Sequence, residues 1–127
     1  MTYRISYISP KDVRELIEHN TEQKKFIIID VRGSDVEGLI IHGAINIPCN
    51  NFIDSVSGIV GMYHTYDYII VHCGQSQNRG PHCAYVLNNA FENSNHKDSK
   101  TEIKILTGGF NAFYNNFMEF DNLFDKV

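Results

Sequence analysis

The chain has 127 residues, of which 43% are hydrophobic and 20% are charged, and its formal net charge is −4. We expect residues 1–127 to form a single domain, because this length suits one domain with a core of its own. The ordinary composition excludes disordered and fibrous chains, and the lack of a basic stripe argues against nucleic-acid binding.

The sequence also bears on the compartment. MTYRISYISPKD (residues 1–12) has no apolar segment of the kind found in secretory signals, and no apolar stretch is long enough to span a bilayer. Cys49, Cys73 and Cys83 are an odd number of cysteines without the spacing of a disulfide framework. Free thiols are typical of a reducing compartment, so we expect a cytoplasmic or nuclear protein with no membrane partner.

The first half of the chain alternates between helix and strand signals. SPKD (residues 9–12) starts a helix that Ser9 caps and that ends near Asn20. The other elements expected before residue 50 are the buried strand FIIIDV (residues 26–31), a short helix over 34–38 that Ser34 caps, and the strand HGAINIP (residues 42–48).

The second half continues the alternation after an irregular segment. Several Asn, Ser and Gly residues weaken any long helix over 50–66, so only a short turn near 52–56 is expected. The later elements are a strand over 68–71, a helix from Pro81, a polar loop over 92–100, a strand over 102–106, a turn at 108–109 and a helix over 110–117. This pattern predicts an α/β domain with a mostly parallel central sheet and helices on both faces.

The segment HCGQSQNRGP (residues 72–81) carries the strongest chemical signal. Cys73 ends a buried strand, and ligands of open α/β sheets bind beyond such strand ends. Gly80 and Pro81 begin a helix, whose free N–H groups and dipole attract anions. Arg79 adds a planar fork of donors that suits a tetrahedral oxyanion, and the same positive field favours the thiolate of Cys73.

A thiolate held under an oxyanion is a nucleophile aimed at the central atom, so the loop predicts chemistry at phosphorus or arsenic. The predicted catalytic residues are Cys73 and Arg79. The predicted oxyanion-binding residues are Gly74, Gln75, Ser76, Gln77, Asn78 and Arg79. In the other interpretation, Cys73 is only a small apolar residue at a strand end.

This loop, His72-Cys73-x5-Arg79-Gly80-Pro81, resembles the active-site loop of the rhodanese-fold phosphatases. That family includes the cell-cycle dual-specificity phosphatases and the small arsenate reductases of yeasts, protozoa and plants. The segments DVR (residues 30–32) with GAINIP (residues 43–48), and LTGGF (residues 106–110), resemble the family as well. The resemblance extends from about residue 9 to residue 117.

The resemblance implies a single rhodanese-like domain that acts through a covalent Cys73 intermediate, as an arsenate reductase, as a phosphomonoester phosphatase of tyrosine or dual-specificity type, or as both. It implies no bound cofactor, a small oxyanion or a phosphorylated molecule as substrate, and glutathione and glutaredoxin as reductants if arsenate is reduced. Sulfurtransferases of this fold close the loop with one residue fewer, which argues against sulfur transfer.

The loop departs from the cell-cycle phosphatases at two positions. Gly74 and Asn78 stand where those enzymes carry carboxylates. A leaving alkoxide needs a proton, and general acid help is typically worth about 10²–10⁴-fold. This departure favours the arsenate reductases. Asp54 and Asp67 are the only nearby acids in the sequence, and for each the interpretation as a solvated loop charge is favoured over that of a proton donor.

A second departure concerns the partner thiol. Val31 occupies the position at which the cell-cycle phosphatases hold a second cysteine. Cys83 and Cys49 then have two interpretations: each is a small apolar core residue, or it resolves an oxidised Cys73. If neither resolves it, the resemblance implies an external thiol.

Three further residues are expected to support the loop. The side chain of His72 should point away from the loop and form a hydrogen bond with the backbone that shapes it. Asp30 and Arg32 are expected to form a buried ion pair or a hydrogen bond to the loop.

Two other functional classes remain as alternatives. One is a catalytically inactive rhodanese-type module that only binds partners. The other is a metal site built from His72-Cys73 and His82-Cys83, but this spacing does not match the usual zinc sites, so no metal is expected.

Overall fold

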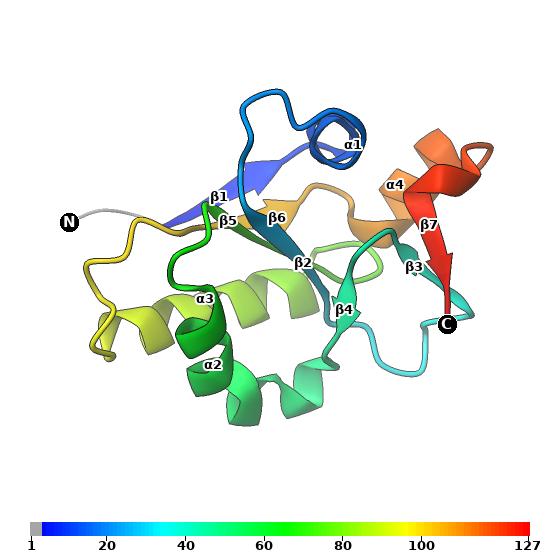
Figure 1. Cartoon of the computed structure of the whole chain (residues 1–127). Helices are drawn as coiled ribbons and strands as arrows, with labels where there is room; N and C mark the ends of the chain where they lie inside the picture. The colour runs from blue at the N-terminus through cyan, green and yellow to red at the C-terminus, as the bar shows by residue number, and fades with distance from the viewer. Residues whose placement is uncertain (1–3) are drawn as a thin grey trace.

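The computed structural model describes residues 4–127 and contains a five-stranded parallel sheet in the order β1-β6-β5-β2-β4 (Figure 1). The predicted α/β class with a mostly parallel sheet is confirmed. The strands of this sheet are β1 (Ile5–Ile8), β2 (Phe26–Asp30), β4 (Ile45–Asn46), β5 (Tyr68–His72) and β6 (Glu102–Leu106).

Four α-helices cover the two faces of the sheet (Figure 1). α1 and α4 lie on one face, while α2 and α3 lie against each other on the opposite face. Ser9 caps α1 as expected, since its hydroxyl accepts a hydrogen bond of 3.1 Å from the Asp12 N–H. The helices are α1 (Pro10–Glu18), α2 (Cys49–Tyr63), α3 (Arg79–Glu92) and α4 (Gly109–Phe117).

Alternation along the central strands divides the core into two parts. Ile29, Ile69 and Val71 belong to the core on the α2 and α3 side, while their neighbours Ile28 and Ile70 belong to the core on the α1 and α4 side. Successive side chains of a strand point to opposite faces, so a continuous apolar run is what a sheet covered on both faces requires.

α2 is the main difference from the sequence-based expectation. The Asn, Ser and Gly residues of this segment predict only a short turn, yet the helix runs for 15 residues. Phe52, Ile59, Val60 and Tyr63 are all buried on one side of it. Burial of this apolar face outweighs the weak helix propensity, as is usual in proteins.

A small second sheet was not expected. β3 (Leu39–Ile41) pairs antiparallel with β7 (Phe124–Lys126), which follows the 3₁₀ helix η1 (Asp121–Leu123). The short helix expected over 34–38 is absent; instead, a turn forms in which the Val36 N–H donates to the Gly33 carbonyl at 3.1 Å. This turn and the β3–β7 sheet both lie beyond the carboxyl ends of the central strands β2 and β5 (Figure 1).

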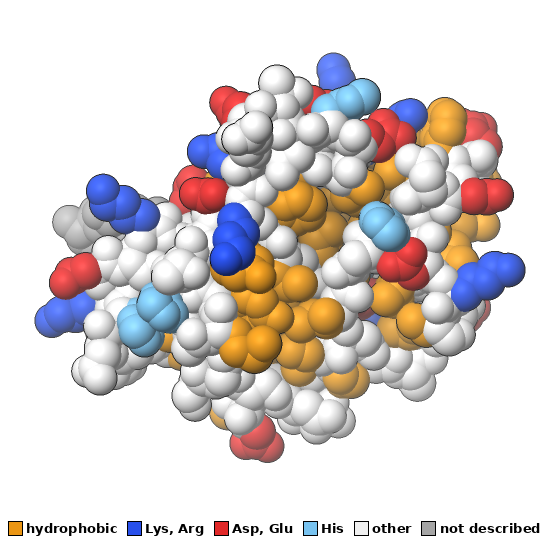
Figure 2. Space-filling model, viewed as in Figure 1, with side chains coloured by type: hydrophobic (Ala, Val, Ile, Leu, Met, Phe, Trp, Pro, Cys, Tyr) orange, Lys and Arg blue, Asp and Glu red, His pale blue; other side chains and the backbone are white. Residues whose placement is uncertain are grey.

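Within residues 4–127, no helix combines the length and the apolar character needed to cross a membrane. Figure 2 shows hydrophobic side chains gathered in the middle of one face, with charged side chains around the margin. Ile53 and Met62 of α2 are among the large apolar side chains that are exposed.

Candidate active site

The loop between β5 and α3 curls around the sulfur of Cys73. The backbone N–H of Ser76 donates to Cys73 Sγ at 3.1 Å. Ser76 has a φ of 55°, a left-handed conformation that few residues other than glycine adopt. A strained residue that turns its amide toward a sulfur is the kind of local feature that is common in active sites.

The start of α4 holds this loop in place. The N–H groups of Phe110 and Asn111 donate to the carbonyls of Cys73 and Gly74, each at 2.9 Å. Gly109 has a φ of 62°, and a Cβ there would lie 2.5 Å from the Cys73 carbonyl oxygen. Only glycine allows this close approach, so the segment LTGGF shapes the loop from a neighbouring strand.

A pocket of about 880 Å³ opens over the loop. Cys73 lines it although only 3% of this residue is exposed. The other loop residues that line the pocket are Gly74, Gln75, Gln77, Asn78 and Arg79. Its further walls include Leu39, Phe110 and Tyr114, and the last two residues of the chain, Lys126 and Val127.

Arg79 is paired with a carboxylate that the sequence analysis missed. Its Nη1 and Nη2 donate to the two oxygens of Asp35 at 2.8 and 2.6 Å. The hydrogen bonds from Arg79 lower the pKa of Asp35 to about 2, and Asp35 in turn raises the pKa of Arg79. Asp35 also lines the pocket, so an ionised acid lies beside the loop at neutral pH.

Asp30 and Arg32 form a second, buried ion pair, one of the two arrangements expected for them. Arg32 Nη2 donates to Asp30 Oδ2 at 2.6 Å, and only 4% of Arg32 is exposed. Arg32 also donates to the Leu39 carbonyl at 2.9 Å, and its guanidinium carbon lies 3.9 Å from the centre of the Phe110 ring. The pair therefore ties the end of β2 to β3 and to α4, which are two walls of the pocket.

His72 is fully buried behind the loop. Its Nδ1 lies 3.1 Å from the Cys73 carbonyl oxygen, and its Nε2 lies 3.9 Å from Asp30 Oδ2. Burial lowers the pKa of His72, and this effect exceeds the opposite influence of Asp30. A neutral ring protonated at Nδ1 donates to the Cys73 carbonyl, which is a contact of the kind expected from the sequence.

The two acids considered from the sequence lie away from the pocket. The carboxylate of Asp67 accepts a hydrogen bond from the Lys25 N–H at 2.8 Å. Asp67 directly precedes β5, so it lies at the amino ends of the strands, away from the pocket. Asp54 is an exposed residue of α2 and does not line the pocket. Asp35 is instead the acid that lies beside Arg79. The only sequence feature that points to Asp35 is its place a few residues after a buried strand.

Cys49 and Cys83 lie outside the pocket lining and contact each other, with 3.3 Å between their sulfur atoms. The two His-Cys pairs do not form a metal site either. Across residues 4–127, no group of three or more His, Cys, Asp or Glu side chains is arranged to hold a metal ion.

Comparison with known proteins places this geometry in a family. The model of the rhodanese-like domain matches residues 9–116. The dual specificity phosphatase ibp1 of Schizosaccharomyces pombe is 34% identical over 123 residues, which cover 86% of this chain and 88% of that protein. The arsenical-resistance protein 2 of Saccharomyces cerevisiae is 28% identical over 117 residues, with coverage of 86% and 88%.

A solved structure shows the same fold. The yeast protein Ygr203w, described as a protein tyrosine phosphatase of the rhodanese family, superposes with a TM-score of 0.83 at 20% identity. The match covers 98% of this chain and 94% of that one. The resemblance predicted from the loop and its two supporting segments is therefore confirmed, and the chain belongs to the rhodanese family.

Proposed function

We propose that this protein is an enzyme that acts on a tetrahedral oxyanion, either a phosphate monoester or arsenate, with Cys73 as its nucleophile. One observation carries the proposal: the Cys73 sulfur accepts the Ser76 N–H within a loop that lines an open pocket together with Arg79. The similarity to a dual specificity phosphatase and to an arsenical-resistance protein supports both substrate classes.

In this proposal, the backbone N–H groups of residues 74–79 and the guanidinium of Arg79 bind the oxyanion. Such preorganised donors stabilise the charge that develops in the transition state. Asp35 occupies the Arg79 fork at 2.8 and 2.6 Å, so binding of the anion replaces one partner of Arg79 by another. The catalytic residues are Cys73 and Arg79. His72, Asp30 and Arg32 hold the backbone around them.

As a phosphatase, the Cys73 thiolate attacks phosphorus while the bond to the ester oxygen breaks and that oxygen takes a proton. Water then attacks the phosphocysteine, which releases phosphate and restores the thiolate. The apolar wall of Leu39, Phe110 and Tyr114 is suited to an aryl ester.

As an arsenate reductase, the Cys73 thiolate attacks arsenic and displaces one oxygen as water. Glutathione then displaces a second oxygen from arsenic as water, and a second thiol, that of glutaredoxin, attacks the glutathione sulfur and breaks its bond to arsenic. The electron pair of the arsenic–sulfur bond stays on arsenic, which becomes trivalent and leaves as arsenite after hydrolysis. Overall, arsenate and two thiols give arsenite, one disulfide and water. No bound cofactor is required.

The state of Asp35 favours arsenate. Its pKa is about 2 while it pairs with Arg79, and after displacement by the substrate an ordinary aspartate pKa of about 4 still leaves it ionised at neutral pH, so it has no proton to give to a leaving alkoxide. Arsenate carries protons on its own oxygens, so its departing oxygen needs less help. Neither Gly74 nor Asn78 supplies an acid.

The test compares two reactions of the purified protein, with Cys73→Ser as the blank. One assay follows hydrolysis of p-nitrophenyl phosphate; the other follows NADPH oxidation coupled to arsenate through glutathione reductase, glutathione and glutaredoxin. We expect arsenate-dependent oxidation that Cys73→Ser abolishes. Phosphatase turnover alone would identify a phosphomonoesterase. Activity in Cys73→Ser would contradict the mechanism, and inactivity of the native chain in both assays would leave the inactive binding module.

A further inference from the structure

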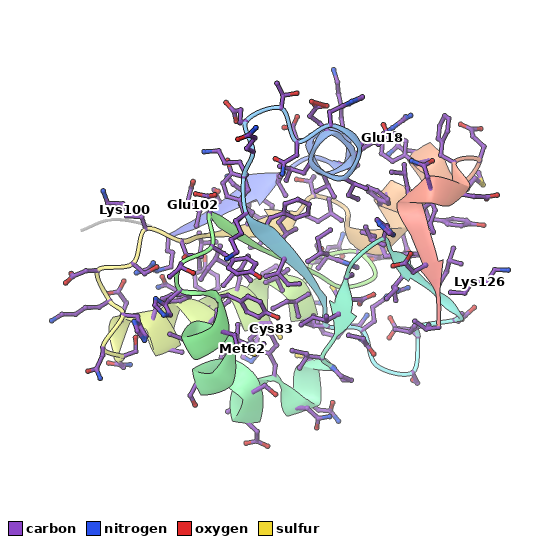
Figure 3. The ribbon with its side chains drawn as sticks, viewed as in Figure 1. Glu18, Met62, Cys83, Lys100, Glu102 and Lys126 are labelled. Carbon is purple, nitrogen blue, oxygen red and sulfur yellow. The ribbon has the colours of Figure 1, made fainter. Side chains whose placement is uncertain are left out.

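Cys49 and Cys83 lie close together in the layer formed by α2 and α3. Cys49 is the first residue of α2, and Cys83 lies in the second turn of α3, where Figure 3 places it between the two helices. The Cys83 thiol donates to Cys49 Sγ over 3.3 Å, although 34 positions separate the residues in the sequence. We infer that Cys49 and Cys83 are an oxidisable dithiol that forms a disulfide with each other, independently of Cys73.

The geometry leaves little to change on oxidation. An S–S bond measures about 2.05 Å, so the two sulfur atoms must approach by only about 1.3 Å. Both residues sit on helices that already contact each other. Small rotations of the two side chains can therefore close the bond while the helices stay in place.

The two sulfur atoms differ in their access to solvent. Cys49 is partly exposed, whereas only 1% of Cys83 is exposed. Burial, followed by the contact with Cys49, raises the pKa of Cys83, so Cys83 remains a protonated thiol at neutral pH. An oxidant therefore reaches Cys49 first.

The chemistry balances with a hydroperoxide as the oxidant. Hydrogen peroxide transfers one oxygen to the Cys49 sulfur, which gives a sulfenic acid and releases water. The Cys83 sulfur then attacks the Cys49 sulfur, and the hydroxyl leaves as a second water with the Cys83 proton. Two thiols and one hydrogen peroxide thus give one disulfide and two waters.

The bond would connect two parts of the active site without using its nucleophile. The Cys49 N–H donates at 3.0 Å to the carbonyl of Val31, the residue between Asp30 and Arg32. Cys83 lies four residues after Arg79 on the same helix. The disulfide therefore links the end of β2 to the helix that carries Arg79, and it leaves the Cys73 thiol free.

The test is peptide mapping under non-reducing conditions after treatment of the reduced full chain with hydrogen peroxide. We expect a peptide that contains the Cys49–Cys83 bond, with Cys73 outside any disulfide, either as a thiol or, because it is the nucleophile of the proposed function, as a sulfenic acid. The same bond should form in Cys73→Ser, so the number of free thiols in that variant should fall from two to zero. A disulfide that includes Cys73, a crosslinked dimer or three unchanged thiols would overturn the inference.

Thermal unfolding gives a second readout. Because the bond closes a loop of 34 positions, we expect the oxidised chain to unfold at a Tm about 5–15 °C higher, and dithiothreitol to reverse the shift. Cys49→Ser alters a partly exposed position and should fold, yet should show no shift on oxidation. A shift of equal size in Cys49→Ser would overturn the inference.

Discussion

Asp35 holds both terminal nitrogens of the Arg79 guanidinium, at 2.8 and 2.6 Å. A carboxylate thus occupies the fork that we propose to bind an oxyanion. Asp35 comes from the turn after β2 and Arg79 is the first residue of α3, 44 positions later, and both line the pocket. In the proposed function, Asp35 therefore competes with the substrate for the Arg79 guanidinium.

The first prediction follows from this competition. Asp35→Asn should bind inorganic phosphate about two- to fivefold more tightly than the native chain. This range corresponds to about 0.4–1 kcal/mol, the upper part of the roughly 0.2–1 kcal/mol typical of exposed ion pairs. Titration calorimetry measures the dissociation constants. Glu37→Gln is the matched control, since it removes the same charge from another residue of the pocket lining. If both variants tightened phosphate binding equally, the effect would come from the loss of one negative charge near the pocket and not from competition for Arg79.

The second prediction concerns the shape of the Arg79 group. A lysine keeps the charge but lacks the planar fork, so Arg79→Lys should lower kcat/KM by about 10²-fold or more, a loss typical of removing an oxyanion donor. Arg14→Lys is the matched control. Arg14 pairs with Glu18 on α1, far from the loop, so the same exchange there should leave turnover unchanged. Near-normal turnover of Arg79→Lys would remove Arg79 from oxyanion binding.

The third prediction tests how α4 shapes the loop. A Cβ at Gly109 would lie 2.5 Å from the Cys73 carbonyl oxygen and 2.7 Å from that of Gly74, at a φ of 62°. Gly109→Ala should therefore lower the free energy of unfolding by about 1–3 kcal/mol or more and also lower turnover. Urea titration and the activity assay measure the two effects.

Gly58→Ala provides the matched control. Gly58 is an exposed residue of α2, and an added Cβ would meet nothing within 4 Å. The same substitution there should raise the free energy of unfolding by about 0.5–1 kcal/mol, because alanine favours the helix. If Gly109→Ala proved as stable as Gly58→Ala, the close approach of α4 to the loop would be wrong.

The fourth prediction is a pH dependence of stability that arises from His72. Burial lowers its pKa in the folded chain below the ordinary 6.5. As the pH falls below 6.5, the unfolded chain takes up a proton at His72 and the folded chain does not. The stabilisation is thus complete above 6.5 and is lost below it, by up to about 1.4 kcal/mol per pH unit.

Urea titrations at several pH values measure this slope. His72→Gln should flatten it, whereas His19→Gln should not, because His19 is exposed at the end of α1. The charged groups nearest to His72 are Asp30, which raises its pKa, and Arg32, which lowers it. An unchanged slope in His72→Gln would assign the acid sensitivity to other groups.

The sequence predicts this site best where its signals are local. Cys73 and Arg79 lie within one loop, and the strand before it and the helix after it are evident from apolar residues and from Gly80-Pro81. α2 was missed because its Asn, Ser and Gly residues suggest irregularity, whereas the burial of Phe52 and Ile59 depends on tertiary contacts.

Other features depend on residues that are distant in the chain. Asp35 pairs with Arg79, which is 44 positions away in the chain. β3 pairs with β7, which follows more than 80 positions later. The contact between Cys49 and Cys83 also arises only when α2 and α3 come together. No periodicity or residue spacing in the sequence predicts such long-range contacts.

The position of β7 has a practical consequence for protein preparation. Lys126 and Val127 line the pocket, so an affinity tag fused after Val127 would emerge at its mouth and could cover it. β1 runs parallel to the other central strands. Its first residue, Ile5, therefore lies at the amino ends of the strands, whereas the loop lies at their carboxyl ends. Fusion at the N-terminal side is the better choice for every assay described above.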